Sequence, residues 1–459
     1  MGILGFMPHV AWVAPFAVLL LCIAVLPLLG TTKHWWERNT SKLLVSVLLG
    51  VITVGYYLWR GVGFEGADPG LASAKLVLSH AILADYVPFI VLLFSLYVIS
   101  GGINLSGDLP AHPMTNTVFI GIGALLASFI GTTGASMLLI RPLLQTNSER
   151  KYVKHTIIVF IFLVCNIGGC LLPIGDPPLF LGYLRGVPFL WPFNLWKEWL
   201  FLNALVLVLY YFWDTWRYRQ EAISDIRRDE IQVAPIRLQG TVNFLLLLVV
   251  VLAVGTLVPG QKFPGTNWVV PDIWHGVGLR ELVQLALVGI SMWLTPGAIR
   301  RANSFNFAAI GEVACLFLGI FVCMQVPIEI LHAVGPKLPE YNLTSPRFFF
   351  WATGILSSFL DNAPTYVVFF ETARSLEWSN PEELLTLTTG GKIALPLLIA
   401  ISLGAVFMGA TSYIGNGPNF MVKSIAEQSG VKMPSFFGYM VYSLVLLGPL
   451  FVVVMFIFL

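Results

Sequence analysis

The sequence predicts an all-α polytopic membrane protein made of inverted repeats, with two re-entrant hairpins and two broken helices. Three observations support this prediction: an apolar composition, a polar motif that occurs twice about 230 residues apart, and an uneven distribution of lysine and arginine. Together they indicate a chain that crosses the bilayer many times and is interrupted inside it.

The composition excludes a soluble globular protein. Of the 459 residues, 57% are hydrophobic and 11% are charged, whereas about a quarter of the residues are charged in soluble domains. Apolar runs of bilayer-spanning length, about 20 residues, follow one another along the chain. The first run has no basic segment before it, so we expect a retained span. The five cysteines all lie in apolar runs, which argues against a disulfide framework or a metal centre.

The positions of the basic residues predict the topology. If the N-terminus lies outside, five inside loops hold 16 of the 26 lysine and arginine residues, as the positive-inside rule expects. These loops are 31–42, 141–154, 217–240, 296–306 and 423–433. The count requires that residues 116–144 and 347–375 each enter and leave the membrane on one side. We therefore expect a multi-pass protein of a bacterial-type inner (cytoplasmic) membrane.

The expected organisation has five parts. Residues 1–83 form N-terminal scaffold helices. Residues 84–195 form repeat one, with an inner hairpin at 116–144 and a broken helix at 155–190. Residues 196–306 are linking transmembrane helices with a cytoplasmic loop at 217–240. Residues 307–433 form the inverted repeat two, with an outer hairpin at 347–375 and a broken helix at 391–428, and residues 434–459 form a C-terminal transmembrane helix.

The first copy of the polar motif places helix breakers among oxygen-bearing side chains. It reads Ser128-Phe-Ile-Gly-Thr-Thr-Gly-Ala-Ser136, followed by Asn166-Ile-Gly-Gly169 and Ile174-Gly-Asp-Pro-Pro178. Proline removes a backbone donor and glycine permits unusual dihedral angles, so the helix should unwind and free its carbonyl groups. Such backbone is tolerated at membrane depth only where it is buried in protein or lines a cavity. The freed carbonyls and the side chains of Thr132, Thr133, Ser136, Asn166 and Asp176 are therefore expected to form an oxygen-rich pocket that suits sodium.

The second copy offers a similar set of groups. It reads Ser358-Phe-Leu-Asp-Asn-Ala-Pro-Thr-Tyr366, followed by Met408-Gly-Ala-Thr-Ser412 and Ile414-Gly-Asn-Gly-Pro418. Paired interruptions in the two halves of a transporter mark its substrate site. The candidate binding residues of this copy are Asp361, Asn362, Thr365, Thr411, Ser412, Asn416 and Asn419.

Two carboxylates, Asp176 and Asp361, are expected where the halves meet. A charged carboxylate at membrane depth costs several kcal/mol, so each should bind a cation or take up a proton. Competition between a metal cation and a proton for the same carboxylate is the basis of cation/proton antiport. Alternatively, each aspartate caps the N-terminus of a half-helix, where a carboxylate is stabilised by the helix dipole. Glu312 is a further candidate for proton coupling, with a packing role as its alternative.

The two motifs resemble signatures of the ion transporter superfamily, which contains sodium/proton antiporters, arsenite pumps, and citrate and dicarboxylate transporters. Asn166-Ile-Gly-Gly-Cys-Leu-Leu-Pro-Ile-Gly-Asp-Pro-Pro178 is similar to the signature of the antiporter and arsenite branches, and Leu360-Asp-Asn-Ala-Pro-Thr365 is similar to their hairpin tip. The likeness spans about residues 84 to 440. It implies a homodimer of elevator-type protomers, in which hairpins and broken helices move as one body against a scaffold. It also implies that the cation ligands come from Thr132, Thr133, Asn166, Asp176, Asp361, Asn362, Thr411 and Asn416.

The predicted function is secondary active transport. A sodium/proton antiporter with Asp176 and Asp361 in the cation/proton site is the first hypothesis, and a sodium- or proton-coupled citrate or dicarboxylate transporter is the alternative. The carboxylate branch typically has Ser-Asn-Thr at both hairpin tips, whereas this chain has Gly131-Thr-Thr133 and Asp361-Asn-Ala363. No enzyme is expected, because an intramembrane aspartyl protease has Gly-x-Gly-Asp where this chain has Pro173 before Ile174-Gly-Asp176. The expected partners are small ions or a small carboxylate and the lipid bilayer, with no cofactor and no nucleic acid.

Overall fold

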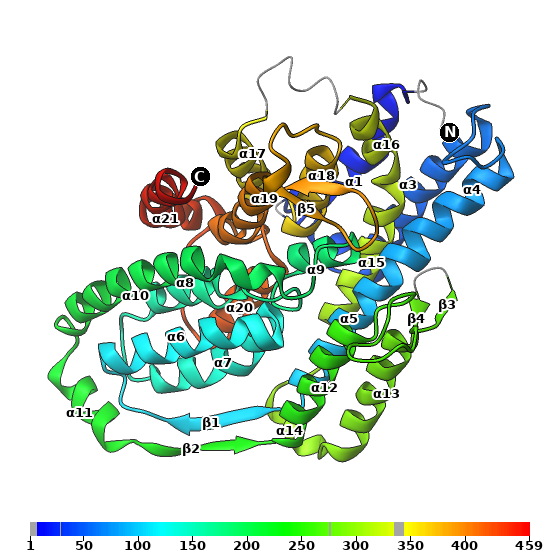
Figure 1. Ribbon diagram of the computed structural model, residues 1–459. Coiled ribbons are helices and arrows are strands. Elements are labelled where there is room, and N and C mark those ends of the chain that lie inside the picture. Colours follow the sequence, from blue (N-terminus) through cyan, green and yellow to red (C-terminus); the bar gives the residue numbers. More distant parts are fainter. Residues whose placement is uncertain (1–6, 28, 275–276, 335–343) are drawn as a thin grey trace.

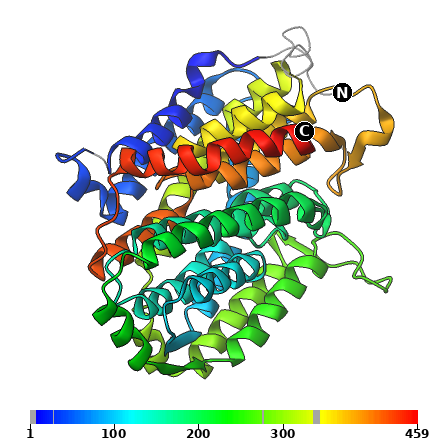
Figure 2. The same ribbon diagram turned by 90° about the vertical axis from the view of Figure 1, so that its left-hand side faces the viewer.

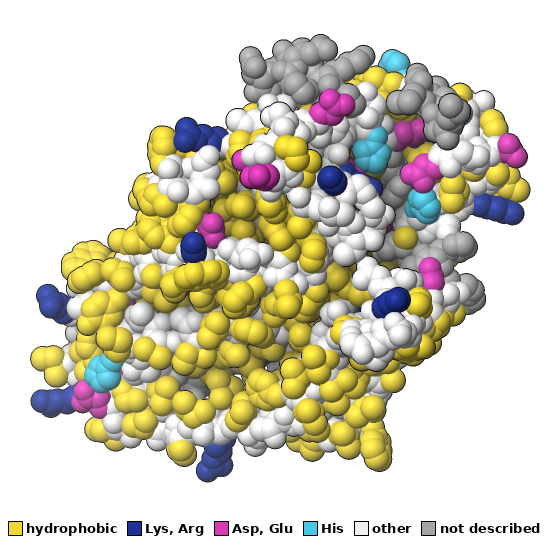
Figure 3. All heavy atoms as spheres, viewed as in Figure 1, with side chains coloured by type: hydrophobic (Ala, Val, Ile, Leu, Met, Phe, Trp, Pro, Cys, Tyr) yellow, Lys and Arg dark blue, Asp and Glu magenta, His cyan; other side chains and the backbone are white. Residues whose placement is uncertain are grey.

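The computed structural model describes residues 7–27, 29–274, 277–334 and 344–459, and most of them are helical. Within this part of the chain, six helical stretches are long and apolar enough to cross a membrane: Asn39–Trp59, Leu71–Ser100, Pro113–Ile130, Trp191–Tyr218, Ala308–Val334 and Phe436–Phe458. Figure 3 shows a broad area of hydrophobic side chains over the left and lower part of one face, with the charged side chains at its margin and in the upper part of the view. The chain is a multi-pass helical membrane protein, as the composition predicts.

One group of helices, here called the scaffold body, lies on the right of Figure 1. In it α3 packs against α4 and α15, and α5 packs against α12 and α13. The span expected at 84–103 begins earlier, at Leu71, because α4 continues through the π-helical segment η2 into α5. Its members are η1 (Val10–Val13), α1 (Ala14–Val25), α2 (Lys33–Trp36), α3 (Asn39–Trp59), α4 (Leu71–Leu78), η2 (Ser79–Tyr86), α5 (Val87–Ser100), α12 (Val242–Thr256), α13 (Leu279–Leu294), α14 (Gly297–Ala302), α15 (Ala308–Cys323) and α16 (Gln325–Val334).

The first repeat forms a helical hairpin and a broken helix. The hairpin is α6 (Pro113–Ile130) and α7 (Thr132–Thr146), which turn at Gly131. Gly131 has a φ of +79°, which glycine adopts without strain. The side-chain amides of Asn116 and Asn147 exchange two hydrogen bonds of 2.9 Å and hold the open ends together. The elements that follow in this repeat are α8 (Lys154–Leu163), η3 (Ile167–Cys170), α9 (Pro177–Leu184) and η4 (Trp191–Leu195). The expected linking segment then begins with α10 (Trp196–Tyr218) and α11 (Ile223–Ile231).

The second repeat has the same core order of a hairpin followed by a broken helix. Its hairpin is α17 (Pro346–Phe359) and α18 (Asn362–Arg374), which turn at Leu360 and Asp361. The helix α17 also packs along α19. The remaining elements are η6 (Pro381–Glu383), α19 (Leu395–Met408), η7 (Gly409–Thr411), α20 (Gly417–Gln428) and α21 (Phe436–Phe458). In Figure 2, α21 and α10 run side by side across the molecule, and they are in contact.

Among the described residues, three short antiparallel ribbons connect these helices. They are β1 (Asn104–Asp108) with β2 (Ala234–Gln239), β3 (Asp272–Trp274) with β4 (Val277–Gly278), and β5 (Leu384–Thr386) with β6 (Lys392–Ala394). The first ribbon, in the register Leu105 to Leu238, runs along the lower edge of Figure 1. It gives structure to part of the loop expected at 217–240 and joins it to the start of the first repeat.

Candidate functional site

Equivalent backbone bonds relate the two repeats at the centre of the protein. The amide of Thr132 at the first hairpin tip donates to the carbonyl of Gly175 at 2.8 Å, and the amide of Asn362 at the second tip donates to the carbonyl of Gly415 at 3.2 Å. One helical turn before each tip, Ser128 donates to the Gly168 carbonyl and Ser358 donates to the Met408 carbonyl. Each hairpin tip is therefore attached to the break of its own repeat in the same way.

Glycine pairs allow each broken helix to fold back on itself. A β-carbon added at Gly175 would lie 2.2 Å from the carbonyl oxygen of Gly169, and one added at Gly415 would lie 2.6 Å from that of Gly409. Both distances are far inside van der Waals contact, so neither position has room for a side chain. The glycines thus bring the two ends of each break together and aim the next residue, Asp176 or Asn416, at the centre.

Asp176 is the central group of the site. Its side chain is 1% exposed. One carboxylate oxygen, Oδ1, accepts from Nδ2 of Asn416 at 2.8 Å and from Oγ1 of Thr132 at 3.2 Å, and Oδ2 accepts from Nδ2 of Asn362 at 2.7 Å. These donors come from both repeats and all are neutral. The carboxyl group of Asp176 is thus surrounded by amides and a hydroxyl, with no basic side chain among its hydrogen-bond partners.

Two amide oxygens next to Asp176 have no hydrogen-bond donor among the described residues. They are Oδ1 of Asn166 and Oδ1 of Asn362, and both are buried. A β-carbon added at Gly409 would lie 3.0 Å from this oxygen of Asn166 and 3.4 Å from Nδ2 of Asn362, so the two amides approach the same spot. The Nδ2 of Asn166 donates to Asn419 at 2.7 Å, which links the two breaks. A carboxylate and two carbonyl-type oxygens are the donor set that hard cations prefer.

The two aspartates differ in their capping role. Asp361 is the N-cap of α18, and its Oδ1 accepts from the amide of Ala363 at 3.0 Å. Asp176 is the N-cap of α9, but its side chain makes no capping hydrogen bond. The capping alternative therefore describes the geometry of Asp361, whereas the carboxylate of Asp176 is directed into the site.

Several candidate residues bond to nearby groups of their own segment or make no hydrogen bond to the central carboxylate. Thr365 donates to the carbonyl of Asp361, and Thr411 donates to that of Met408. Ser412 accepts from the amides of Ile414 and Gly415 and so shapes the second break. Thr133 is partly exposed on α7. The structure therefore brings together Thr132, Asn166, Asp176, Asn362, Asn416 and Asn419.

Glu312 lies in the scaffold body and not at this centre. It is on α15, and its Oε1 is 2.8 Å from Nζ of Lys42 on α3, a lysine whose side chain is only 4% exposed. A buried lysine needs a counter-charge, so this ion pair joins two scaffold helices. This position fits the alternative that Glu312 has a packing role instead of a role in proton coupling.

An ion cluster that the sequence analysis did not anticipate joins the two repeats to the scaffold body. Arg185, at the end of α9, donates to Glu371 on α18 at 3.0 Å and to Asp85 on η2 at 3.3 Å. The second oxygen of Glu371 is 3.0 Å from Nε2 of His332 on α16. The partners are far apart in the sequence, and single charges near the ends of apolar runs resemble ordinary membrane-surface residues, so no local signal identified them.

A second buried ion cluster holds the base of the first hairpin. Asp214 on α10 is fully buried and accepts from Arg150 at 2.6 Å, from Asn116 at 3.2 Å and from Tyr210 at 3.3 Å. Nε2 of His155, on α8, is 2.8 Å from the same carboxylate. Because every member has a partner, this cluster has the properties of a structural clamp.

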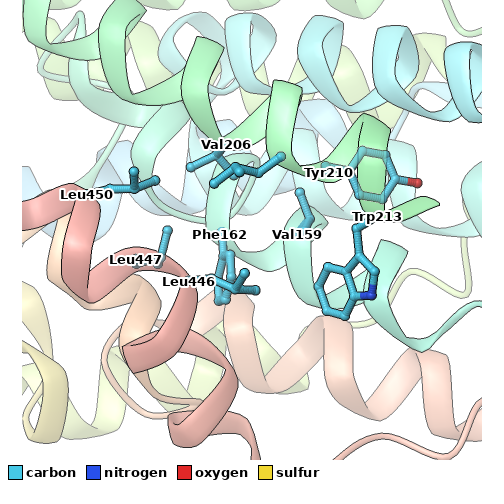
Figure 4. A pocket seen from close by; sticks show the side chains of 9 residues that line it. Val159, Phe162, Val206, Tyr210, Trp213, Leu446, Leu447 and Leu450 are labelled. Atoms are coloured by element: carbon cyan, nitrogen blue, oxygen red, sulfur yellow. The ribbon is translucent and has the colours of Figure 1, made fainter. Parts of the chain in front are cut away.

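A narrow recess between α8, α10 and α21 has a different character. Figure 4 shows its lining, which includes Val159, Phe162, Val206 and Leu447. The polar side-chain atoms of the lining belong to Tyr210, whose hydroxyl oxygen is 3.0 Å from Oγ1 of Thr156, and to Trp213. No charged side chain lines this recess, so it does not suit an ion.

The paired hairpins, the paired helix breaks and the enclosed carboxylate define a multi-pass membrane protein with an internal duplication of the kind found in membrane transporters. A family model described as "putative citrate transport" matches residues 7–459. The chain belongs to this family, which confirms the resemblance to the ion transporter superfamily and supports the citrate alternative more than the antiporter hypothesis. A search of curated proteins finds no match.

Proposed function

We propose that this protein is a secondary active transporter that moves a small carboxylate such as citrate together with a sodium ion or proton held at Asp176. The observation that carries the proposal is the fully buried carboxylate, enclosed by neutral groups from both repeats and accompanied by two amide oxygens without a donor. A charge in that position gains most from binding a cation or a proton, because the surrounding protein offers neither.

The anionic substrate is supported by family membership and by the directions of four helices. The helices α7, α9, α18 and α20 all begin at the tips or breaks that meet around Asp176. Helix N-termini carry partial positive charge and favour anions, and broken helices in transporters use this feature to bind anionic substrates. A cation at Asp176 would add to this positive field, so binding of the cation would favour binding of the carboxylate.

Sodium/proton antiport is the second candidate. It is favoured by Asp361, a second carboxylate located one residue before Asn362, which contacts Asp176 directly. Two carboxylates close together would weaken anion binding and strengthen competition between sodium and protons.

Proteoliposomes separate the two candidates. Under the proposal, an inward sodium or proton gradient drives accumulation of labelled citrate, and dissipating that gradient stops it. Under antiport, adding sodium or lithium releases protons from vesicles that hold a pH gradient, in the absence of any carboxylate. Sodium-induced proton release without citrate uptake at any pH would reject carboxylate transport.

The proposal includes an orientation and a mode of movement. With the N-terminus outside, the basic loops 31–42, 141–154 and 217–240 face the cytoplasm of a bacterial-type cell. The hairpins and broken helices would move as one body against the scaffold body within a homodimer. Membrane-impermeant labelling of a single cysteine introduced into loop 217–240 tests the orientation, because only inside-out vesicles should react.

A further inference from the structure

Arg141 is a partly buried arginine without a partner in the part of the chain that the structure describes. It lies on α7 of the first hairpin, and its Nε is buried with no hydrogen-bond acceptor. The other buried or partly buried arginines make hydrogen bonds or ion pairs: Arg60, Arg150, Arg185, Arg217, Arg280, Arg300 and Arg374. The Nε–H of Arg141 is removed from water without an acceptor, and the rest of its guanidinium makes no ion pair with the described residues, so Arg141 is free to bind an acceptor that the protein itself does not supply.

The equivalent position in the second hairpin supports this expectation. Arg141 follows Thr132 by nine residues, and Glu371 follows Asn362 by nine residues, where Thr132 and Asn362 make the equivalent tip bonds. Glu371 is 4% exposed and is paired with Arg185 and His332. The charged residue at this position of the second hairpin, Glu371, is thus paired with opposite charges, whereas the equivalent residue of the first hairpin, Arg141, has no counter-charge among the described residues.

Helix geometry places Arg141 on the side of α7 that leads to the hairpin tip. Thr133, Met137 and Arg141 are spaced four residues apart and are all partly exposed, while the residues between them are buried. They form one stripe along α7. Nine residues span about 13 Å of helix, and side chains on a helix tilt toward its N-terminus, which here means toward Thr132 and Asp176.

We propose that Arg141 binds a carboxylate group of the transported anion as that anion passes between the central site and the side of the membrane on which the first hairpin opens. This inference rests on the proposed function and names the residue that would distinguish a carboxylate from a cation as substrate. The planar guanidinium donates two parallel hydrogen bonds to a carboxylate, a geometry that the ammonium of lysine does not reproduce.

Lipid phosphate offers the same chemistry from another source, so the experiment includes both. Purified wild-type protein, Arg141→Gln and Arg141→Lys are reconstituted in phosphatidylcholine with and without phosphatidylglycerol. Arg301→Gln is the matched control, because Arg301 is exposed on α14 of the scaffold body. Citrate uptake is measured as KM and maximal rate, together with its dependence on sodium and pH.

The expected result is a KM for citrate raised about tenfold or more in Arg141→Gln, as loss of a charged, bidentate contact implies. Arg141→Lys should fall between this variant and the wild type, and Arg301→Gln should behave as wild type. The sodium and pH dependence of the remaining uptake should not change, because it arises at Asp176. An unchanged KM in Arg141→Gln overturns the proposal, and so does a defect that occurs only in vesicles with phosphatidylglycerol.

A binding measurement separates failure of this inference from failure of the proposed function. Thermal stabilisation of the detergent-solubilised protein is measured with mono-, di- and tricarboxylates, with sodium chloride as reference. If the wild type does not take up citrate but a carboxylate stabilises it, and Arg141→Gln removes that stabilisation, the anion site stands while the transport assignment falls. If no carboxylate stabilises the wild type, the anion site is overturned.

Discussion

Replacement of Asp176 by asparagine removes the central charge while keeping its shape. The new amide retains one acceptor oxygen for Thr132 and Asn416. Its Nδ2 would face Asn362, whose Oδ1 lacks a donor and can accept after rotation of the amide. Asp176→Asn should therefore fold, whereas Asp176→Ala leaves buried donors without acceptors at roughly 1–3 kcal/mol each.

The size of the expected effect follows from the lost charge. A cation about 4 Å from a carboxylate gains about 4 kcal/mol at an effective dielectric constant near 20, which corresponds to roughly a thousandfold in affinity. Sodium stabilisation of purified Asp176→Asn, measured by thermal unfolding over a sodium titration, should shift to higher concentrations by about that factor. Sodium- or proton-driven transport in liposomes should be abolished.

A charge exchange across the same contact tests the reasoning more strictly. The double variant Asp176→Asn with Asn362→Asp moves the carboxylate across a 2.7 Å hydrogen bond without changing the composition of the site. It should recover part of the cation dependence that Asp176→Asn loses. If Asp176→Asn alone keeps wild-type dependence on sodium and pH, the cation is not held at this carboxylate and the proposed coupling is refuted.

Three further predictions concern the break, the clamp and the second aspartate. A methyl group at Gly175 would lie 2.2 Å from a backbone oxygen, so Gly175→Ala should abolish transport or folding. The control Gly417→Ala should do neither, because nothing lies within 4 Å of the added β-carbon. Equal activity of the two variants would contradict the folded-back geometry of the first break. Asp214→Asn weakens the pairing of the buried Arg150 and should lower the free energy of unfolding in detergent by up to about 3–5 kcal/mol. The control Glu427→Gln removes an ion pair at the surface of one helix and should cost about 0.5 kcal/mol or less. Similar losses in the two variants would show that the Asp214 cluster is not a clamp. Asp361→Asn keeps a side chain that can cap α18, so the stability of this variant should match that of the wild type. Intact transport would show that Asp361 only caps the helix. Loss of antiport with intact folding would favour the second candidate function.

The sequence was sufficient to locate the breaks and hairpin tips because the residues that cause them act locally. Proline in Gly175-Asp-Pro-Pro178 and glycine at Gly131 restrict or free the backbone whatever surrounds them. In the structure α9 begins at Pro177, and α6 ends just before Gly131. The start of α4 at Leu71 was not evident, since a lysine and a histidine interrupt the apolar run but not the helix. The ribbon between β1 and β2 was also not evident, because its strands are separated by more than a hundred residues.

Choosing among the polar residues of the motifs required the tertiary structure. Asp176, Asn362 and Asn416 converge, whereas Thr411 and Ser412 bond to backbone groups nearby in their own segment. From sequence all five are short polar side chains beside a helix break, and each can bond locally or across the fold. Which alternative holds depends on how two repeats more than two hundred residues apart pack against each other.

The sequence by itself determined that this chain is a duplicated membrane protein with irregular backbone in both halves, because hydropathy and the constraints of proline and glycine depend on a few neighbouring residues. Only the tertiary structure decided that Asp176 is enclosed by groups of both halves, that Asp361 caps its helix, and that Arg141 lacks the counter-charge that Glu371 has. Partnership between distant side chains is a property of packing, and packing is settled only when the whole chain is folded.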